Sequence, residues 1–442
     1  MKNKSIACLL FLLLLTGIEV EAQTSAATKE WTLRECIDYA HQNNIQLKKQ
    51  QQTVEISKIS LAQSKSELFP TLNAGATQAF TNQKDLQGGT GQEQSFTGNY
   101  SVTSDMILYN GSKLKNSILQ NELSVKSGEL GVQVSENDME LNITAAYLKI
   151  LYARESVLNS RNALLSSELQ FKRAKDLYDA GYIAESNYAQ VQSQYSSDKY
   201  SLVLAINTQS DLILQLKQLL QLDASVELNI SYPELDESQV MKAIPAMDTV
   251  INKALSEMPE IENSKVAIEI AGKDLEIAKA GLLPSLSLSA SMATGYNSTS
   301  TGSYATQLGN NFYQNAGLSL RIPIFNNKQV KSSIAIAKIG VETARLSQAE
   351  TQVDLTTRIE TAYLDALASQ SRFQAASEQL GFIKISYSLV EEQFNLGMKN
   401  TVELLTEKTK YLSAQQEYLQ AKYTAILNYK ILDFYQNKPI VL

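Results

Sequence analysis

The sequence predicts an α+β membrane protein built from a duplicated helix–strand–strand–helix unit. Three observations support this fold class. Segments of the first half return in the second half, long stretches carry heptad repeats, and short stretches alternate strictly between polar and apolar residues. Self-similarity at a fixed offset is the signature of a copied structural unit. The fold class therefore depends first on how well the two halves match.

The two halves match in four pairs of segments that keep their order along the chain. The first pair is offset by 214 residues and the other three by 216. The pairs are LFPTL at 68–72 with LLPSL at 282–286, ILYN at 107–110 with PIFN at 323–326, AYL at 146–148 with 362–364, and YDAG at 178–181 with FNLG at 394–397. Chance could produce one such match, but not all of them in order.

Each unit predicts the same succession of elements. Proline at 70 and at 284 ends a helix, because the residue before proline avoids the helical region. Each long helix would extend for about 100 Å and end at a glycine in the left-handed conformation. The first repeat, 23–222, has helices in 32–69, strands at about 70–80 and 96–108, a long helix at 111–178 and a return helix at 183–222. The second repeat, 250–436, has helices in 250–283, strands at about 284–296 and 313–324, a long helix at 327–394 and a return helix at 400–436. A linker, 223–249, joins the repeats, and a tail, 437–442, ends the chain.

The amino terminus and the composition exclude several classes of function. Residues 1–22 resemble a secretory signal peptide, with a basic start, the apolar run CLLFLLLL and a small-residue cleavage site. The run is too short to span a bilayer. The net charge of −7 offers no basic field for nucleic acid. Cleavage leaves one cysteine, Cys36, beside one histidine, His41. We therefore expect no clustered metal site, no cofactor and no nucleophile–base pair.

The long helices carry heptad rows, which predict coiled-coil packing. One row in each long helix has four aromatic or aliphatic residues seven apart, and the second return helix has two adjacent rows. Those of the long helices are Val157, Leu164, Phe171 and Tyr178, and Phe373, Leu380, Tyr387 and Phe394. Those of the return helix are Leu405, Leu412, Leu419 and Ile426, and Leu404, Tyr411, Tyr418 and Ala425. Two rows imply neighbours on two sides, as in a closed ring of helices.

The strands alternate between polar and apolar residues with a period of two. In 284–296, serines at every second position face one side, and Leu286, Leu288, Ala290 and Met292 face the other. Apolar-out, polar-in alternation is typical of an outer-membrane barrel. A soluble sandwich is the alternative, but four strands offer no second sheet to cover them. The residues expected to face the water-filled lumen are Ser285, Ser287, Ser289, Ser291, Ser319, Arg321 and Asp105.

Four strands cannot close a barrel around a channel, since membrane barrels begin at about eight strands. Open strand edges are not tolerated in lipid. Several copies of the chain must therefore share one barrel. Two copies would give eight strands, and three would give twelve.

In the order and spacing of these parts the chain resembles the TolC family of outer-membrane efflux proteins. The resemblance covers nearly all of the mature chain. It rests on the duplicated unit, the paired LFPTL and LLPSL segments, and the glycine turns LYDAGYIAES and QFNLGMKNTVELL. It implies a homotrimer in the outer membrane of a Gram-negative bacterium. A twelve-stranded β-barrel, with four strands per chain, would contact outer-membrane lipid and continue into a long α-helical coiled-coil barrel in the periplasm. Linker 223–249 and the tail would girdle the helical barrel.

The resemblance also implies function and partners. The family forms the exit duct of tripartite efflux or type I secretion assemblies, which export small molecules or proteins. Its helical tips dock onto a periplasmic adaptor, or membrane fusion, protein, and an inner-membrane pump of the RND or ABC type supplies the energy. The residues expected at the docking tips are Gly181, Tyr182, Leu396, Gly397 and Met398.

The same tips would close the pore as an iris, and here the sequence departs from the family. Phe394 lies where the family often has a tyrosine that ties the closed iris by a hydrogen bond. Lys399 lies where the family often has an arginine, and lysine lacks the planar guanidinium that can donate two parallel hydrogen bonds. Asn187, beside Ser186, replaces a carboxylate partner. Glu403 matches an aspartate that rings the pore, and Thr406 has lost a second such charge.

Glu403 admits two interpretations. Three carboxylates at one level of a trimer would repel, attract cations and resist ionisation. Alternatively, Glu403 caps a helix or pairs with a neighbour on the outer surface.

Two other functions remain as alternatives. An exported coiled-coil structural or adhesive surface protein would carry heptads, but the duplicated alternating strands disfavour it. An enzyme is the more distant alternative, because the sequence offers no nucleophile–base set, metal cluster or phosphate loop.

Overall fold

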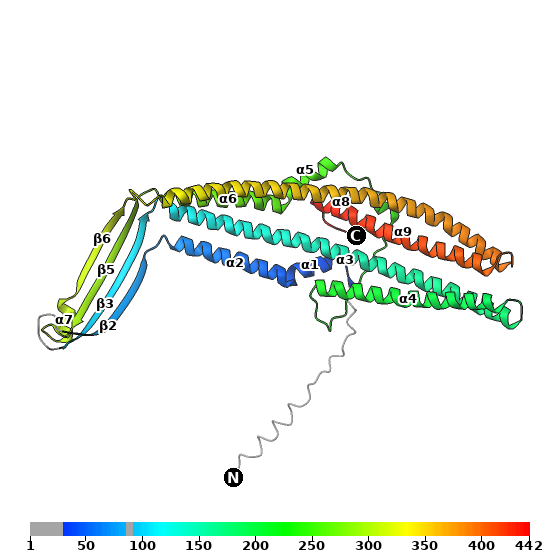
Figure 1. Ribbon diagram of the computed structural model, residues 1–442, viewed down its shortest axis with the longest axis horizontal. Coiled ribbons are helices and arrows are strands. Elements are labelled where there is room, and N and C mark those ends of the chain that lie inside the picture. The colour runs from blue at the N-terminus through cyan, green and yellow to red at the C-terminus, as the bar shows by residue number, and fades with distance from the viewer. Residues whose placement is uncertain (1–29, 85–91) are drawn as a thin grey trace, which may run out of the picture.

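The computed structural model describes residues 30–84 and 92–442, which form one long rod (Figure 1). A four-stranded sheet lies at one end, and long helices run away from it to the other end. The signal peptide expected at 1–22 lies outside the described residues.

The two repeats contribute matching elements to this rod. The first repeat forms α1 (Leu33–Asn43), α2 (Ile45–Ser66), β2 (Thr71–Lys84), β3 (Gln92–Tyr109), α3 (Lys113–Asp179) and α4 (Glu185–Leu219). The second repeat forms α5 (Met247–Glu257), α6 (Pro259–Ala280), β5 (Ser285–Asn297), β6 (Tyr313–Arg321), α8 (Gln329–Asn395) and α9 (Thr401–Tyr435). Further short elements are β1 (Glu30–Trp31), β4 (Asn229–Ile230), the 3₁₀ turn η1 (Glu237–Gln239) and α7 (Tyr304–Asn310).

Local signals explain where the paired helices break. The side chain of Asn44 accepts hydrogen bonds from the backbone N–H groups of Gln46 and Leu47, so it ends α1 and caps α2. In the second repeat Pro259 opens α6 at the position where a missing N–H costs nothing. Over residues 30–84 and 92–442, no helix is both long enough and apolar enough to cross a membrane.

The strands depart from the sequence prediction in length and in their connection. β2 and β3 have 14 and 18 residues, where the alternation predicts about ten. The hydrogen-bond ladder continues past the alternating segment into residues that are polar on both faces. The connection between β5 and β6, where the sequence predicts no helix, contains α7, whose first turn is capped by the hydroxyl of Ser303.

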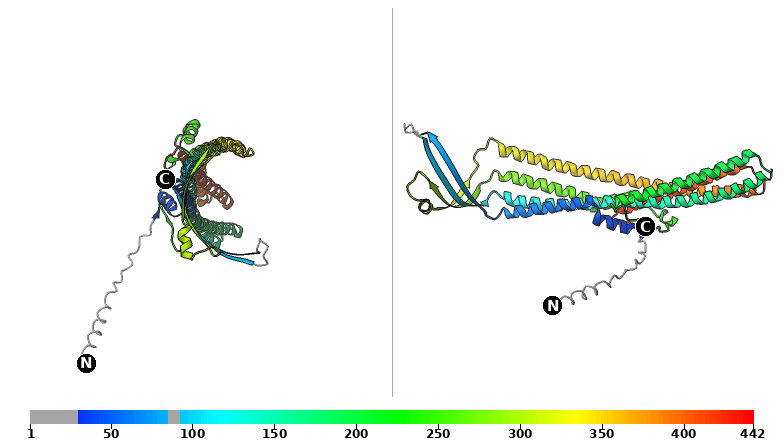
Figure 2. Two further views of the ribbon diagram at one scale, coloured as in Figure 1. Left: turned by 90° about the vertical axis from the view of Figure 1, so that its left-hand side faces the viewer. Right: turned by 90° about the horizontal axis from the view of Figure 1, so that it is seen from below.

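The sheet is antiparallel, with the strand order β2-β3-β5-β6. The hairpin of each repeat stays intact, and the two hairpins join through β3 and β5. Seen along the rod, strands and helices lie on one arc, with α5 and the carboxyl terminus on its convex side (Figure 2). β2 and β6 are left as the two open edges of the sheet.

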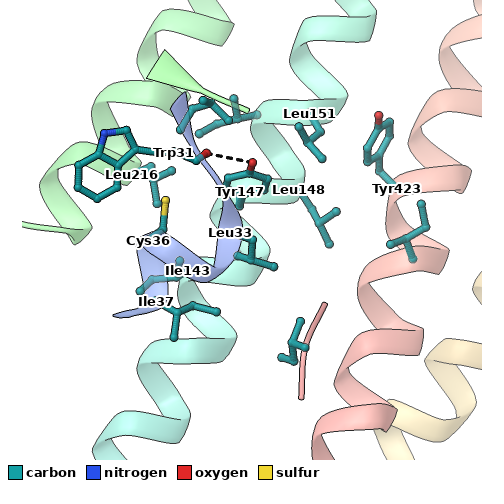
Figure 3. Packing of buried hydrophobic residues seen from close by; sticks show 14 of the residues in the cluster. Trp31, Leu33, Cys36, Ile37, Ile143, Tyr147, Leu148, Leu151, Leu216 and Tyr423 are labelled. Atoms are coloured by element: carbon teal, nitrogen blue, oxygen red, sulfur yellow. Dashed lines mark hydrogen bonds between the residues drawn. The ribbon is translucent and has the colours of Figure 1, made fainter. Parts of the chain in front are cut away.

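The main core lies at mid-length, where the linker 223–249 packs on the helical wall (Figure 3). β4 of the linker pairs in parallel with β1. The hydroxyl of Tyr147 in α3 donates to the carbonyl oxygens of Trp31, at 3.2 Å, and Ser231, at 2.5 Å. Cys36 is fully buried among apolar side chains of this core, and Ile440 of the tail also packs in it.

The long helices pack along their heptad rows. Tyr387 of α8 stacks on Tyr411 of α9, with ring centroids 5.2 Å apart. Phe171 of α3 stacks on Tyr188 and Tyr195 of α4. The predicted seams therefore hold each helix against its return helix, and two hairpins, α3/α4 and α8/α9, form one end of the rod.

Candidate channel and gate

The strand register sorts the sheet residues onto two chemically different faces. Residues directly opposite each other in antiparallel neighbours share a face. The seven residues expected to face the lumen all lie on one face, since Ser285 pairs with Arg321, Ser287 with Ser319, and Asp105 with Ser289, and Ser291 follows Ser289 at the same spacing. Two complete rows of this face are Thr71–Asp105–Ser289–Gly317 and Asn73–Thr103–Ser291–Asn315. This face is lined by hydroxyl and amide groups and carries few charges.

The opposite face is apolar and ends in aromatic residues. Ala74, Val102 and Met292 form one row, and Leu288 pairs with Leu318. Leu286 to Tyr296 extends about 33 Å along the strand, which at a barrel tilt of about 40° is close to the 25 Å apolar band of outer-membrane barrels.

The aromatic rim lies at the end of the sheet away from the helices. Phe80 packs on Phe96 there, with ring centroids 4.9 Å apart. The ring of Tyr304 in α7 lies 5.0 Å from Tyr296, and its hydroxyl donates to that of Tyr100 at 2.8 Å. α7 is thereby held against the apolar face, at the level where aromatic girdles meet the membrane surface.

One residue breaks the alternation for a structural reason. The register between β3 and β5 shifts between Ile107 and Tyr109, so Leu108 is an extra residue in a β-bulge. Ile107, opposite Ser287, consequently lies on the polar face. The period-two alternation is interrupted here, because the bulge inserts one residue and changes the direction of the strand end.

The tips of both hairpins have the same construction. Gly181 and Gly397 adopt φ values of 78° and 75°. At each tip the N–H group after the glycine donates to a carbonyl oxygen of the last helical turn: Tyr182 donates to Leu177 and Met398 to Gln393, each at 2.8 Å. The glycine ends the helix in this motif because a side chain there would strain the backbone.

The tips expose apolar side chains at the far end from the sheet. Tyr182 is 80% exposed, and Leu396 and Met398 are each 70% exposed. Single exposed apolar residues are ordinary, but a cluster at the end of a rod is a candidate contact surface. The structure thus brings the five residues expected at the docking tips to one end of the molecule.

The expected gate residues lie just behind the tips, but they do not form one cluster. Phe394 is half-buried, Asn187 is half-buried near the start of α4, and Ser186 and Thr406 are exposed. The hydroxyl of Thr406 donates to the carbonyl oxygen of Val402 at 2.7 Å. Lys399, which precedes α9, pairs with Glu403 in its first turn, with Nζ 2.6 Å from Oε1.

In the single chain the contacts of Glu403 are local. Its Oε2 accepts the N–H of Asn400 at 3.1 Å, which completes a capping box at the start of α9. The bonds from Lys399 and Asn400 hold the pKa of Glu403 below its usual value of 4.5. In the single chain the second interpretation of Glu403, a capping and paired glutamate, describes its contacts.

This pairing predicts how the pore selects ions. If Glu403 and Lys399 face the axis of a trimer, their charges cancel at one level. Glu403→Gln leaves three ammonium groups and should shift the reversal potential toward anion preference, and Lys399→Gln should shift it toward cations. Because the pKa of Glu403 is lowered, the wild-type preference should hold from pH 8 down to the usual value of 4.5 and change only below it. Single-channel recording in planar bilayers measures both effects, and unchanged selectivity in both variants would place the pair away from the pore.

A buried ion pair that the sequence does not reveal joins the two hairpins. Lys408 of α9 and Asp198 of α4 lie 2.8 Å apart, and their side chains are 2% and 5% exposed. Gln194 donates to the other oxygen of Asp198 at 2.7 Å, and Lys408 also donates to the carbonyl oxygen of Ala163 in α3 at 3.4 Å. The two charged residues are 210 positions apart, and each lies in a polar stretch that reads as a solvated helix face.

Two further contacts tie the hairpins closer to the tips. Arg173 of α3 donates to the side-chain oxygen of Asn395 at 2.5 Å and to its carbonyl oxygen at 2.9 Å. Glu391 of α8 accepts from Gln170 at 3.2 Å and from the hydroxyl of Tyr387 at 3.0 Å. Burial raises the pKa of Tyr387 to about 12, so this hydroxyl stays protonated and donates. These residues, rather than the expected gate set, connect the two hairpins within the chain.

No group of three or more His, Cys, Asp or Glu side chains in residues 30–84 and 92–442 is placed to hold a metal ion. The structure offers a two-faced sheet, a continuous helical wall and two hairpins joined by hydrogen bonds near their tips.

Comparisons with known proteins agree with this architecture. The family model described as outer membrane efflux protein matches residues 250–433, within the second repeat. The outer membrane protein TolC of Escherichia coli is 23% identical over 428 residues, which cover 94% of this chain and 84% of TolC.

Solved structures show the same fold at low identity. The structure of CusC superposes with a TM-score of 0.78 at 15% identity and covers 92% of both chains. The CmeC outer membrane channel of Campylobacter jejuni superposes with a TM-score of 0.76 at 18% identity, over 91% of this chain and 85% of CmeC. The fold is thus shared over nearly the whole length, the sequence aligns with TolC through both repeats, and residues 250–433 match the family of outer membrane efflux proteins.

Proposed function

We propose that the chain forms the outer-membrane exit duct of a tripartite efflux or type I secretion assembly, through which small molecules or proteins leave the cell. The observation that carries the proposal is the direct continuation of the two-faced sheet into α3 and α8, helices of 67 residues each. At about 1.5 Å per residue these helices reach about 100 Å from the membrane. One chain can therefore line a water path from the outer membrane far into the periplasm.

A homotrimer closes this path. The open edges β2 and β6 must pair, because unpaired strand edges are not tolerated in lipid. Three copies give a barrel of twelve strands. The outer helices also expose apolar residues that a neighbouring copy would bury. They are Ile336, Ile339, Leu346 and Val353 on α8, Ile56 and Ile59 on α2, and Tyr200 and Leu204 on α4.

The exposed tips are the proposed contact with a periplasmic adaptor protein, which links the duct to an inner-membrane pump of the RND or ABC type. Tyr182, Leu396 and Met398 supply apolar contact area at the end farthest from the sheet. Aromatic residues and methionine are enriched in protein interfaces, and methionine adapts to the shape of a partner.

Mass and conductance test the duct. The protein purified in mild detergent should have about three times the 48.8 kDa of the precursor chain, reduced slightly by removal of the signal peptide. It should form discrete channels in a planar bilayer. A stable monomer that conducts would contradict the trimer, and a trimer without conductance would contradict the duct.

Capture of the adaptor from membranes is the second arm of this test. Met398→Glu places a charge on the exposed tip without altering the glycine turn and should reduce the amount of adaptor that co-purifies. Met241→Glu is the matched control, because Met241 is 50% exposed but lies in the linker. Equal capture by both variants would remove the tips from the docking surface.

A further inference from the structure

A cavity of about 270 Å³ lies between α3 and α9 at the level of the mid-length core. Its floor is mainly apolar, and its rim carries polar groups. The residues that line it include Leu148, Lys149, Tyr152, Tyr423, Thr424 and Leu427. Nothing in the proposed duct requires a cavity at this place, because a smooth wall would conduct equally well.

Contacts on the far side of α3 show which way the cavity opens. Tyr147 donates to Ser231, and the guanidinium of Arg154 lies 3.7 Å from the ring centroid of Tyr232, so this side of α3 faces the linker. At about 100° per residue, Lys149 lies on the opposite side of the helix.

The same geometry holds for α9. Tyr418 donates to Glu237 of the linker at 2.5 Å. Thr424 lies about 120° from Tyr418 around the axis of α9 and borders the cavity. Since the linker and the carboxyl terminus pack on the convex side of the arc, the cavity opens on the concave side (Figure 2). A neighbouring copy would pack at the edges of the arc and leave this side free.

The chemistry of the cavity selects an amphipathic anion. Leu148 and Tyr423 are buried and offer an apolar floor. Lys149 is exposed at the rim, and no carboxylate of the described residues lies within 4.0 Å of its ammonium group. Lys149 is the charged group among the lining side chains, and Thr424 beside it can donate a further hydrogen bond.

We propose that this cavity is a docking niche in the channel wall for small amphipathic organic anions in transit, with three niches per trimer. The apolar body of the solute lies on the floor, and its anionic group pairs with Lys149. The proposal rests on the proposed function, because it takes the concave side of the arc as the lumen. A dissociation constant on the order of 1 mM suits a solute of about a dozen heavy atoms that must also leave.

Equilibrium dialysis on the purified full chain in detergent tests the niche. The probes are 1-naphthoate, the uncharged 1-naphthamide and the cation 1-naphthylmethylammonium, with empty micelles subtracted. Wild-type protein should retain the anion best. Lys149→Gln should weaken naphthoate binding by about ten-fold, the factor expected for a charge pair of about 1.4 kcal/mol, and should leave naphthamide unchanged. Lys149→Glu should reverse the order of anion and cation.

Two further variants complete the test. Lys172→Gln removes an exposed lysine of the same helix that pairs with Glu168 outside the cavity, and it should bind like wild type. Thr424→Trp should fill the niche and abolish retention of all three probes. Equal binding by wild type and Lys149→Gln, or full retention by Thr424→Trp, would overturn the proposal. Loss of conductance in bilayers would overturn the duct and leave this binding measurement readable, so the two failures are distinguishable.

Discussion

Replacing Lys408 with methionine is expected to lower the free energy of unfolding by about 3–5 kcal/mol, the cost of leaving one member of a buried ion pair without its partner. Asp198 is 5% exposed and would keep the hydrogen bond from Gln194 as its compensation. Guanidinium unfolding of the detergent-purified protein, followed by circular dichroism, measures the loss.

The same helix offers a matched control. Lys410 is two residues further along α9, and its ammonium group lies 2.7 Å from Glu407, but its side chain is 56% exposed. Lys410→Met should cost no more than about 1 kcal/mol, because water screens an exposed pair. The double variant Lys408→Met with Asp198→Leu should recover most of the lost stability, since it removes both charges from the interior. Equal effects of Lys408→Met and Lys410→Met would show that the pair is not buried in the assembled protein.

The position of this pair bears on how the tips open. It ties α9 to α3 and α4 through Ala163 and Asp198, while Arg173 and Gln170 tie α3 to α8 nearer the tips. If the tips open by separating the two hairpins, all these bonds must break. Lys408 and Asp198 would regain water as they separate, which offsets part of the cost of breaking their pair.

The sequence predicts the regular parts of this molecule because their signals are local and repeated. Gly181 and Gly397 mark the tips since their positive φ is required by the turn itself. The serines of β5 reveal a polar face because a strand alternates with a period of two whatever lies around it. The duplication then doubles each signal, so a weak pattern in one repeat is supported by its copy.

The sequence does not predict the contacts that join the hairpins. Asp198 and Lys408 are 210 residues apart, and their pairing depends on the crossing of two helices. For Glu403 the family pattern leaves a charged ring and a capping role both open. Its capping box is a local signal, since Asn400 lies three residues before Glu403. α7 escaped prediction because its seven residues carry no periodic apolar pattern.

Replacing Met292 with arginine is expected to destabilise the membrane-inserted protein by about 2–4 kcal/mol, the cost of a cationic side chain on the lipid face at the bilayer midplane. Met292 is 52% exposed, lies on the apolar face, and falls between Leu286 and the aromatic rim at Tyr296. Folding of the protein into lipid vesicles, titrated with guanidinium and followed by tryptophan fluorescence of Trp31, reports the difference.

The neighbouring serine makes the test specific to the face of the sheet. Ser291 precedes Met292 in β5 but lies in the polar row with Thr103 and Asn315. Ser291→Arg adds the same side chain at the same depth and should cost little, because it enters a water-filled lumen. It should instead lower cation conductance, since it adds three positive charges to a sparsely charged wall. Equal destabilisation by the two variants would show that the alternation does not separate lipid from water. The reverse order, with Ser291→Arg the more costly, would assign the serine face to lipid and require the barrel to close the other way.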